Sequence, residues 1–289
     1  MRFDQKYLRR LILVCSGIII LPAVHAAAVL PVQDGLIAHF STSAVELDGN
    51  TVTQLTDLSG RGNHATGGDG PTLVSSQTPS GADGMSFDGI GNFLEIASNP
   101  DDFDGRARTT LAVFRPNDIS DQNQRVFNSS YDNMVNTHHL YWIGGEKIRV
   151  RNRDADGNIV NADTSDGSLK EGEFHIGGNV WYDDGEMLAV LVDEANTRFT
   201  GAGSGALAIP DGHRQTRLGA EGGFTATRFF NGDIAAMVIF DRGLSVSELL
   251  QVEGYLYDTY VIPEPANVAF LFGGTVLLFL IVRRRFVRK

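Results

Sequence analysis

The stretch FNGDIAAMVIFDRGLS, Phe230–Ser245, contains the run Ile234–Phe240, in which every residue is apolar. Consecutive side chains of an extended chain point to opposite sides, so this run would present apolar groups on both faces. A strand of this kind is typical of the middle of a sheet that is covered on both sides. We therefore predict a central β-strand over Ile234–Phe240.

Upstream of this strand, short apolar runs alternate with clusters of Gly, Asn, Asp and Ser, without long helical periodicity. Three of these clusters predict hairpin loops, at Asp88–Asn92, Asp154–Asn158 and Asp183–Gly185. Such spacing favours one all-β sandwich of about 230 residues, which is long enough to bury a sizeable core. The other predicted strands are Gly35–Phe40, Val52–Leu55, Met85–Phe87, Phe93–Ile96, Thr110–Phe114, Lys147–Arg153, Ile159–Ala162, Phe174–Tyr182 and Met187–Val192.

One helix is predicted directly after the central strand. Ser245 and Glu248 have the spacing of a capping box, in which each side chain bonds an exposed backbone N–H at the helix start. Apolar residues then recur near helical spacing, at Leu249, Val252, Leu256 and Tyr260. We expect this apolar face to pack on the edge of the sandwich.

Three stretches resemble those of LamG-like, concanavalin A-like jelly rolls. Asp57–Ala65, DLSGRGNHA, is similar to the family pattern D-x-S-G-x-G-N-H. Met85–Ile96 resembles its SFDG…Y-x-x-I segment, and Phe230–Ser245 resembles its F-x-G-x-I…V-x-I-Y-x-R-x-L-S ending. The resemblance implies an all-β, two-sheet antiparallel jelly-roll sandwich over residues 27–260 with one short C-terminal helix. It also implies that the early strand Gly35–Phe40 lies beside Ile234–Phe240.

The N-terminus has the pattern of a secretory signal peptide. Basic residues precede the apolar core Leu11–Leu21, and small residues with the favoured cleavage point at Ala26 follow it. We therefore predict a signal peptide over residues 1–26, with the secretory translocon and signal peptidase as partners. The single cysteine, Cys15, lies in this segment and follows Val14 rather than the small residue expected in a lipoprotein signal. The mature chain would then have no disulfide.

The C-terminus, residues 261–289, has three parts: a Pro-Glu-Pro triplet, the uncharged run Val268–Val282 and a basic end. The run predicts a short transmembrane helix over about residues 268–282, with the basic end in the cytoplasm. This order resembles the PEP-CTERM sorting signal of Gram-negative bacteria, which implies cleavage by an exosortase-type membrane protease; the alternative is an ordinary single-pass anchor. The residues of this signal are Pro263, Glu264, Pro265, Arg283, Arg284 and Arg285.

Charge limits the range of partners. Between Val29 and Ile262 the chain has 15 basic and 33 acidic residues, which argues against nucleic acid and anionic membrane surfaces. The excess of carboxylates leaves Ca2+ binding open, although no residue is assigned as a ligand. The residues weighed as metal ligands are Asp101, Asp102, Asp104, the loop Asp154–Asn158, His64, His138 and His139. The favoured interpretation of His64, Asp57, Asn63 and Asp88 is hydrogen bonding within turns.

No pattern for catalysis is present. The G-x-S-x-G, H-E-x-x-H and P-loop motifs are missing, and Glu171 and Glu173 adjoin Gly172 in a predicted turn. We therefore expect an exported module of the cell surface or extracellular matrix, held first on the periplasmic side of the inner membrane. It would bind a polysaccharide, another exopolymer or a surface protein. The alternatives are a polysaccharide-active enzyme, either glycosidase or lyase, and a purely structural surface protein.

Overall fold

The computed structural model describes residues 29–67, 69–96, 109–121, 124–131, 137–143, 146–153, 158–182, 186–192, 198–202, 214–221 and 226–262. The chain divides into two compact units, Met1–Leu30 and Pro31–Lys289, and the architecture below is that of the second. Its strands are β1 (Leu36–Ser41), β2 (Val45–Asp48), β3 (Thr51–Leu55), β4 (Ala65–Thr66), β5 (Thr72–Val74), β6 (Gly84–Asp88), β7 (Leu94–Ile96), β8 (Thr109–Pro116), β9 (Arg125–Tyr131), β10 (Thr137–Ile143), β11 (Lys147–Arg153), β12 (Ile159–Asp163), β13 (His175–Trp181), β14 (Glu186–Val192), β15 (Arg198–Ala202), β16 (Arg214–Leu218) and β17 (Asn231–Phe240). The helix α2 (Val246–Tyr260) follows β17.

Sheet I is built around β17, which is paired along both edges. One edge pairs with β8, and the other pairs first with β6 and then with β1. The change of partner falls at a register shift between Ile234 and Ala236. The antiparallel order then continues from β8 through β13 and β14 to β15. The predicted central strand and its pairing with the early strand are both confirmed.

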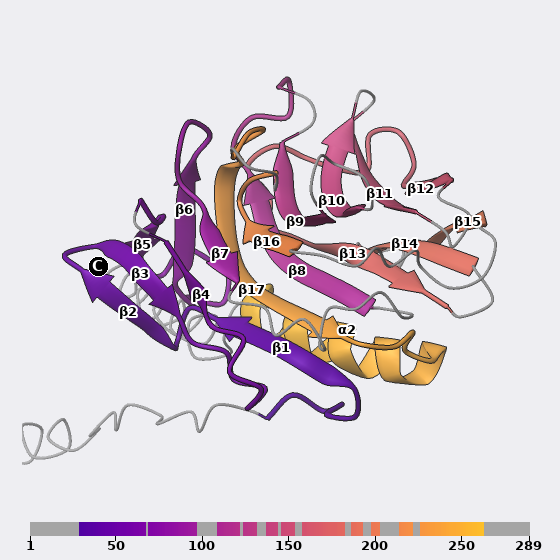
Figure 1. Ribbon diagram of the computed structural model, residues 1–289, viewed down its shortest axis with the longest axis horizontal. Helices are drawn as coiled ribbons and strands as arrows, with labels where there is room; N and C mark the ends of the chain where they lie inside the picture. The colour runs from indigo at the N-terminus through magenta and orange to yellow at the C-terminus, as the bar shows by residue number, and fades with distance from the viewer. Residues whose placement is uncertain are drawn as a thin grey trace, which may run out of the picture. The chain divides into compact units, whose positions relative to one another are not determined.

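Sheet II is a second antiparallel series, in the order β2, β3, β4, β7, β16, β9, β10, β11 and β12. The short strand β5 pairs with both β3 and β6, and so links the two sheets at one corner. Figure 1 shows β9 to β12 as one layer and β8, β13 and β14 as another. The all-antiparallel two-sheet arrangement is the predicted jelly-roll sandwich.

The core lies between the inner faces of the two sheets. Alternate residues of β17, among them Ile234, Met237 and Ile239, point into it together with Phe40 of β1 and Phe114 of β8. Sheet II contributes buried apolar residues from alternate positions of its own strands: Leu94, Phe127, Ile148, Val150, Val160, Ala162 and Leu218. Because β17 is also buried on its outer side, its whole length is apolar beyond Asp233.

The helix α2 covers the outer side of sheet I. Its cap is the predicted box, with Ser245 accepting the N–H of Glu248 and the Glu248 side chain accepting the N–H of Ser245. The hydroxyl of Tyr260 donates to Ser41 Oγ of β1 at 3.0 Å, and the Tyr255 ring lies edge-on to His39 of β1. Figure 1 shows α2 running alongside β1. The helix thus covers a sheet face, whereas the sequence predicted only an edge.

The prediction of a hairpin at Asp88–Asn92 is wrong. Strand β6 pairs with β5 and β17 in sheet I, while β7 pairs with β4 and β16 in sheet II. The loop between them therefore crosses from one sheet to the other, and Asp88 Oδ1 fixes it by accepting the N–H groups of Ile90, Gly91 and Asn92. The other two predicted hairpins, β11–β12 and β13–β14, are confirmed.

The predicted signal peptide and the sorting tail from Pro263 onward, including the apolar run Val268–Val282, lie outside the described residues. Among the helices that the structure does describe, none has the length and apolar character needed to cross a membrane.

Candidate functional site

The stretch Asp57–Ala65 forms hydrogen bonds within its own loop and to strand β1. Asp57 accepts four hydrogen bonds: Oδ1 from the N–H groups of His39 and Ser59, and Oδ2 from the Ser59 hydroxyl and the Asn63 N–H. Asn63 Nδ2 donates to the carbonyl oxygen of Ile37 at 2.7 Å. His64 Nδ1 accepts the N–H of Asp57, so it bonds backbone within its own stretch, whereas a bond to a neighbouring loop was predicted. This motif therefore fastens a loop to β1, and its polar groups are used in doing so.

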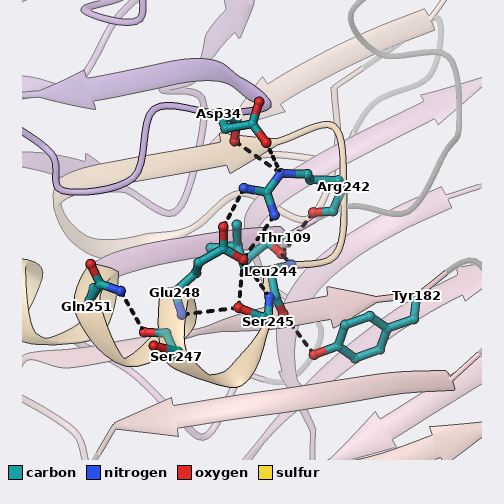
Figure 2. Close-up of polar contacts among 9 residues, drawn as sticks. All are labelled: Asp34, Thr109, Tyr182, Arg242, Leu244, Ser245, Ser247, Glu248 and Gln251. Atoms are coloured by element: carbon teal, nitrogen blue, oxygen red, sulfur yellow. Dashed lines mark hydrogen bonds and ion pairs between the residues drawn. The ribbon is translucent and has the colours of Figure 1, made fainter.

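The closing stretch after β17 has a similar structural role. Arg242 donates to both carboxylate oxygens of Glu248 on α2, at 2.7 and 3.0 Å, and to the carbonyl oxygen of Asp34 before β1 (Figure 2). These bonds from Arg242, with those from Ser245, lower the pKa of Glu248 to about 2, and the Glu248 partner raises the pKa of Arg242. Thr109 and Tyr182 bond the backbone of the same turn (Figure 2). This contact joins the first strand, the last strand and the helix.

The outer side of sheet II, in contrast, carries charged and amide side chains. The Cα register aligns residues in one row across six strands: Glu95, Arg217, Asn128, His139, Arg151 and Asn161. A second row across β9, β10, β11 and β12 contains Arg125, Tyr141, Arg149 and Asp163. Since neighbouring strands are about 4.8 Å apart, Glu95 and Arg217 in the first row, and Arg149 and Asp163 in the second, are within side-chain reach of one another.

Arg217 of β16 lies in a closed set of contacts. Its Nε and Nη2 both lie 3.1 Å from Glu95 Oε2 on β7, and Nη1 donates to the carbonyl oxygen of Glu221. Its guanidinium carbon lies 4.8 Å from the centre of the Phe93 ring, which is the geometry of a cation–π contact. The Phe93 ring in turn lies 6.4 Å from that of Phe229. A carboxylate, a guanidinium and two aromatic rings are thus adjacent.

Glu221 joins two further arginines to this set. Its side chain is 2% exposed, and Oε2 lies 2.5 Å from Arg228 Nη1 and 3.5 Å from the Nη2 of Arg125, which is itself 1% exposed. Arg228 is 46% exposed and has a backbone φ of 51°, a left-handed conformation that non-glycine residues rarely adopt. Its carbonyl oxygen accepts the N–H of Arg125, so the backbone at this turn is tied to the start of β9.

Two more arginines come from β11. Arg149 donates to both oxygens of Asp163 on β12, at 2.6 and 2.5 Å, and Arg151 Nε donates to Asn161 Oδ1 at 2.8 Å. Both point outward because Ile148 and Val150 occupy the alternate, buried positions of the same strand. We use the name arginine face for Arg125, Arg149, Arg151, Arg217 and Arg228 together with the carboxylates bonded to them, Glu95, Asp163 and Glu221.

The structure places few of the sequence candidates in one site. The sorting residues, Asp101, Asp102, Asp104 and positions 154–157 lie outside the described residues. His138 and His139 are consecutive in β10, a strand that the sequence did not predict. Glu171 accepts the N–H of Ile119, and the exposed Glu173 pairs with Lys170. Within the part of the chain that is described, no three His, Cys, Asp or Glu side chains are grouped as metal ligands.

The arginine face was missed by the sequence analysis, although a signal for part of it is present. Lys147–Arg153 reads KIRVRNR, so basic residues occupy every second position of a predicted strand. This alternation predicts a cationic row on one side of a strand whose other side is apolar. The contributions of Glu95, Arg217 and Glu221 depend on pairing between strands far apart in the sequence and have no local signal.

The sequence matches no protein-family model and no curated protein. Among solved structures, the chain is similar to Trypanosoma rangeli sialidase in complex with sialic acid, with a TM-score of 0.55 and 13% identity over 82% of this chain and 35% of that one. A second structure of T. rangeli sialidase gives a TM-score of 0.53 and 14% identity over 81% and 34%. The CBM40 of Ruminococcus gnavus IT-sialidase bound to α2,3-sialyllactose gives 0.47 and 14%, over 58% and 95%.

This chain spans about a third of the length of the T. rangeli chains that it matches. At these identities the likeness concerns the fold and not the site. Together with the two antiparallel sheets, it shows that the described chain is a jelly-roll β-sandwich.

Proposed function

We propose that this chain is an exported LamG-like module that binds glycans of the cell envelope or extracellular matrix, and that the arginine face is its contact surface. The observation that supports this is the set Arg217, Glu95, Phe93 and Phe229. Sugars offer hydroxyl groups that both donate and accept hydrogen bonds, and apolar ring faces that pack on aromatic rings. Glu95 is 42% exposed and offers acceptor atoms beside the Phe93 and Phe229 rings, while Arg217, which is 5% exposed, holds Glu95 and the Phe93 ring in position.

We place the binding surface on sheet II because the outer side of sheet I is covered by α2. The helix α2 lies on the outer side of sheet I and buries Leu249, Val252, Leu256 and Tyr260. The polar groups of the stretch Asp57–Ala65 and of the turn after β17 are used in hydrogen bonds that hold the fold together. On the arginine face, in contrast, Glu95 is 42% exposed and Arg228 is 46% exposed, so charged atoms reach solvent. A ligand could therefore contact them without displacing an element of the fold.

An enzyme on this fold is the second candidate, supported by the similarity to sialidase chains. A glycosidase of the usual kind needs two carboxyl groups, about 5–5.5 Å apart in retaining enzymes and about 6.5–9.5 Å apart in inverting ones. Each of the three carboxylates of the arginine face is instead ion-paired with an arginine. This pairing argues against a two-carboxylate glycosidase at this face. Sialidases use a tyrosine nucleophile, so the two-carboxylate rule does not apply to them.

Binding is tested with the purified full-length protein in detergent on a glycan array. The test variant is Phe93→Ala, which removes the ring beneath Arg217. The matched control is Phe174→Ala, because Phe174 makes the same type of contact with Arg115, at 5.1 Å, on the other sheet. We expect array binding that is lost in Phe93→Ala and kept in Phe174→Ala. Equal binding by both variants, or no binding by the wild-type protein, would contradict the proposal.

The C-terminal tail supports a second part of the proposal, which is that an exosortase-type protease sorts the chain. In a host that encodes such a protease, the mature protein should lack Val268–Lys289, and Glu264→Ala should leave an uncleaved, membrane-retained form. Mass spectrometry of the exported protein measures this directly. Detection of intact Arg288 on the exported protein would instead favour an ordinary anchor.

A further inference from the structure

The arginine face has the opposite charge to the rest of the chain. It contains five of the 15 basic residues between Val29 and Ile262 but only three of the 33 acidic ones. Arg125, Arg217 and Glu221 are buried, so the charges of this face that reach solvent are those of Arg149, Arg151 and Arg228 against Glu95 and Asp163. The face is therefore net positive on a chain whose remaining residues are strongly negative. The overall excess of acidic residues is explained by solubility. Solubility does not explain a cationic face on an acidic protein, because random placement of the charges would make this surface negative too.

The arrangement of the arginines fits a ligand with spaced anionic groups. Arg149 and Arg151 are two positions apart on β11 and point to the same side, which separates their Cα atoms by about 6.5–7 Å. Arg149 is held by Asp163 and Arg151 by Asn161, so both guanidinium groups are oriented before any ligand arrives. Planar guanidinium groups bind carboxylate and sulfate with two parallel hydrogen bonds.

Arg228 is the most exposed arginine of the arginine face, and its pairing with Glu221 fixes the position of its side chain. Arg228 and the buried Arg125 both contact one carboxylate oxygen of Glu221, so two positive charges share one negative partner there. The left-handed backbone of Arg228 is maintained although a glycine would adopt it without strain. A residue that is half exposed and held in such a conformation is well placed to meet an anion from solvent.

From the charge of the arginine face and the spacing of its guanidinium groups, we infer that it binds acidic polysaccharide, in which carboxylate or sulfate groups recur along the chain. This inference rests on the proposed glycan-binding function and adds the substrate class. The anionic groups pair with the guanidinium groups of Arg149, Arg151 and Arg228, while Phe93 and Phe229 pack against the sugar rings. The negative charge of the remaining surface repels polyanions, and so confines their binding to this face.

The test uses the full-length protein in detergent and three probes: polygalacturonate, which carries carboxylates, dextran sulfate, which carries sulfates, and neutral dextran. Biolayer interferometry measures Kd at low and high NaCl. We expect one or both acidic polymers to bind and dextran not to bind. The Kd should rise about tenfold or more between about 0.05 and 0.5 M NaCl, because salt screens exposed charges. The stronger acidic probe identifies the anionic group.

The variant for this test is the double substitution Arg151→Gln and Arg228→Gln, which should weaken binding of the acidic probe about tenfold or more. The control is Lys170→Gln, which removes an exposed positive charge outside the face and should leave the Kd unchanged. Thermal unfolding of each variant identifies any loss of fold, and Arg151→Gln alone then serves as the milder variant. Equal binding of dextran and polygalacturonate, or an equal loss in Lys170→Gln, would overturn the inference.

The two proposals fail in different ways. If neutral glycans bind on the array and their binding depends on Phe93, the glycan-binding function stands and the preference for acidic polymers is wrong. If no glycan binds on the array or in solution, both are wrong.

Discussion

The outer sides of the two sheets are built in opposite ways. On sheet I, β17 and β8 are apolar on both faces, and α2 closes the outer face with Leu249, Val252, Leu256 and Tyr260. On sheet II, β11 and β12 alternate buried Val150 and Ala162 with outward Arg149 and Asp163. The same rule, that successive side chains alternate across a strand, therefore gives a packed layer on one side and a charged layer on the other.

The difference indicates where each face obtains its stability. Sheet I depends on apolar burial beneath a helix, whereas the arginine face depends on pairs of charges, some of them buried. Substitutions that remove methyl groups should therefore be costly beneath α2, and on the arginine face substitutions that remove a buried charge should be costly. Sheet I also contains the buried carboxylate of Asp233, paired with Arg115, so the contrast concerns the region beneath α2 and not every charge of sheet I.

The largest effect is expected for Glu221→Gln on sheet II. Loss of this buried carboxylate leaves the guanidinium of Arg125 buried without the negative charge of Glu221, and breaking a buried pair from one side costs about 3–5 kcal/mol. The control is Asp163→Asn in the partly exposed pair with Arg149, which should cost about 1 kcal/mol or less. Urea unfolding measures both, and equal losses would show that the Glu221 pair has no special weight.

The next effect is expected for Leu256→Ala on the buried side of α2. Removal of a large apolar side chain from a closed layer costs about 2–5 kcal/mol, depending on how far the surroundings relax. Leu250 lies on the same helix but is 45% exposed, so Leu250→Ala should change the free energy of unfolding by no more than about 0.5 kcal/mol. Similar losses in the two variants would mean that α2 does not close sheet I.

The division between the faces also explains what the sequence could predict. Ile234–Phe240 and the helix after Ser245 have strong local patterns, apolar on both faces and periodic at helical spacing, and both predictions are confirmed. The prediction of a hairpin at Asp88–Asn92 was wrong because the sequence of a glycine-containing loop between two apolar runs does not show whether those runs join the same sheet or two different sheets. The strands β2, β4, β5, β9, β10, β15 and β16 were not predicted, since they are short or their sequences are polar or mixed.

The candidate site was harder to predict than the fold, for a physical reason. Arg149 and Arg151 are two positions apart, so the alternation of β11 alone places them together. Glu95 pairs with Arg217 only because β7 and β16 are neighbours, and Glu221, which follows β16, reaches Arg125 only because β16 and β9 are neighbours. That order of strands is set by core packing throughout the sandwich. Local patterns contain no information about such long-range pairing.

A smaller effect is expected for the helix cap, which anchors the closed face. Ser245→Ala removes the side chain that accepts the N–H of Glu248 and should cost about 0.5–2 kcal/mol. The Glu248 carboxylate has a pKa of about 2 in the folded chain, below the ordinary 4.5, so its stabilisation is complete above 4.5 and is lost as the pH falls towards 2. Urea unfolding across this range should show that loss in the wild type. A Glu248→Gln variant with the same pH dependence would contradict it.

The smallest effect is expected from His39, which lies beneath α2. Its Nε2 is buried without a hydrogen-bond partner, and the Tyr255 ring lies 6.3 Å away, edge-on. Burial lowers the pKa of His39 below 6.5, and the charge of nearby Asp57 opposes this shift in part. The unfolded chain then binds a proton more readily than the folded one, so stability decreases as the pH falls below 6.5. This pH range lies above the range in which Glu248 acts, and the two contributions can be separated by unfolding measurements at intermediate pH.

His39→Phe keeps an aromatic ring against Tyr255 but cannot titrate, so it should remove the pH dependence of stability between about 7 and 5. If the variant keeps that dependence, another group titrates in this range, and the closed face of sheet I is not the source.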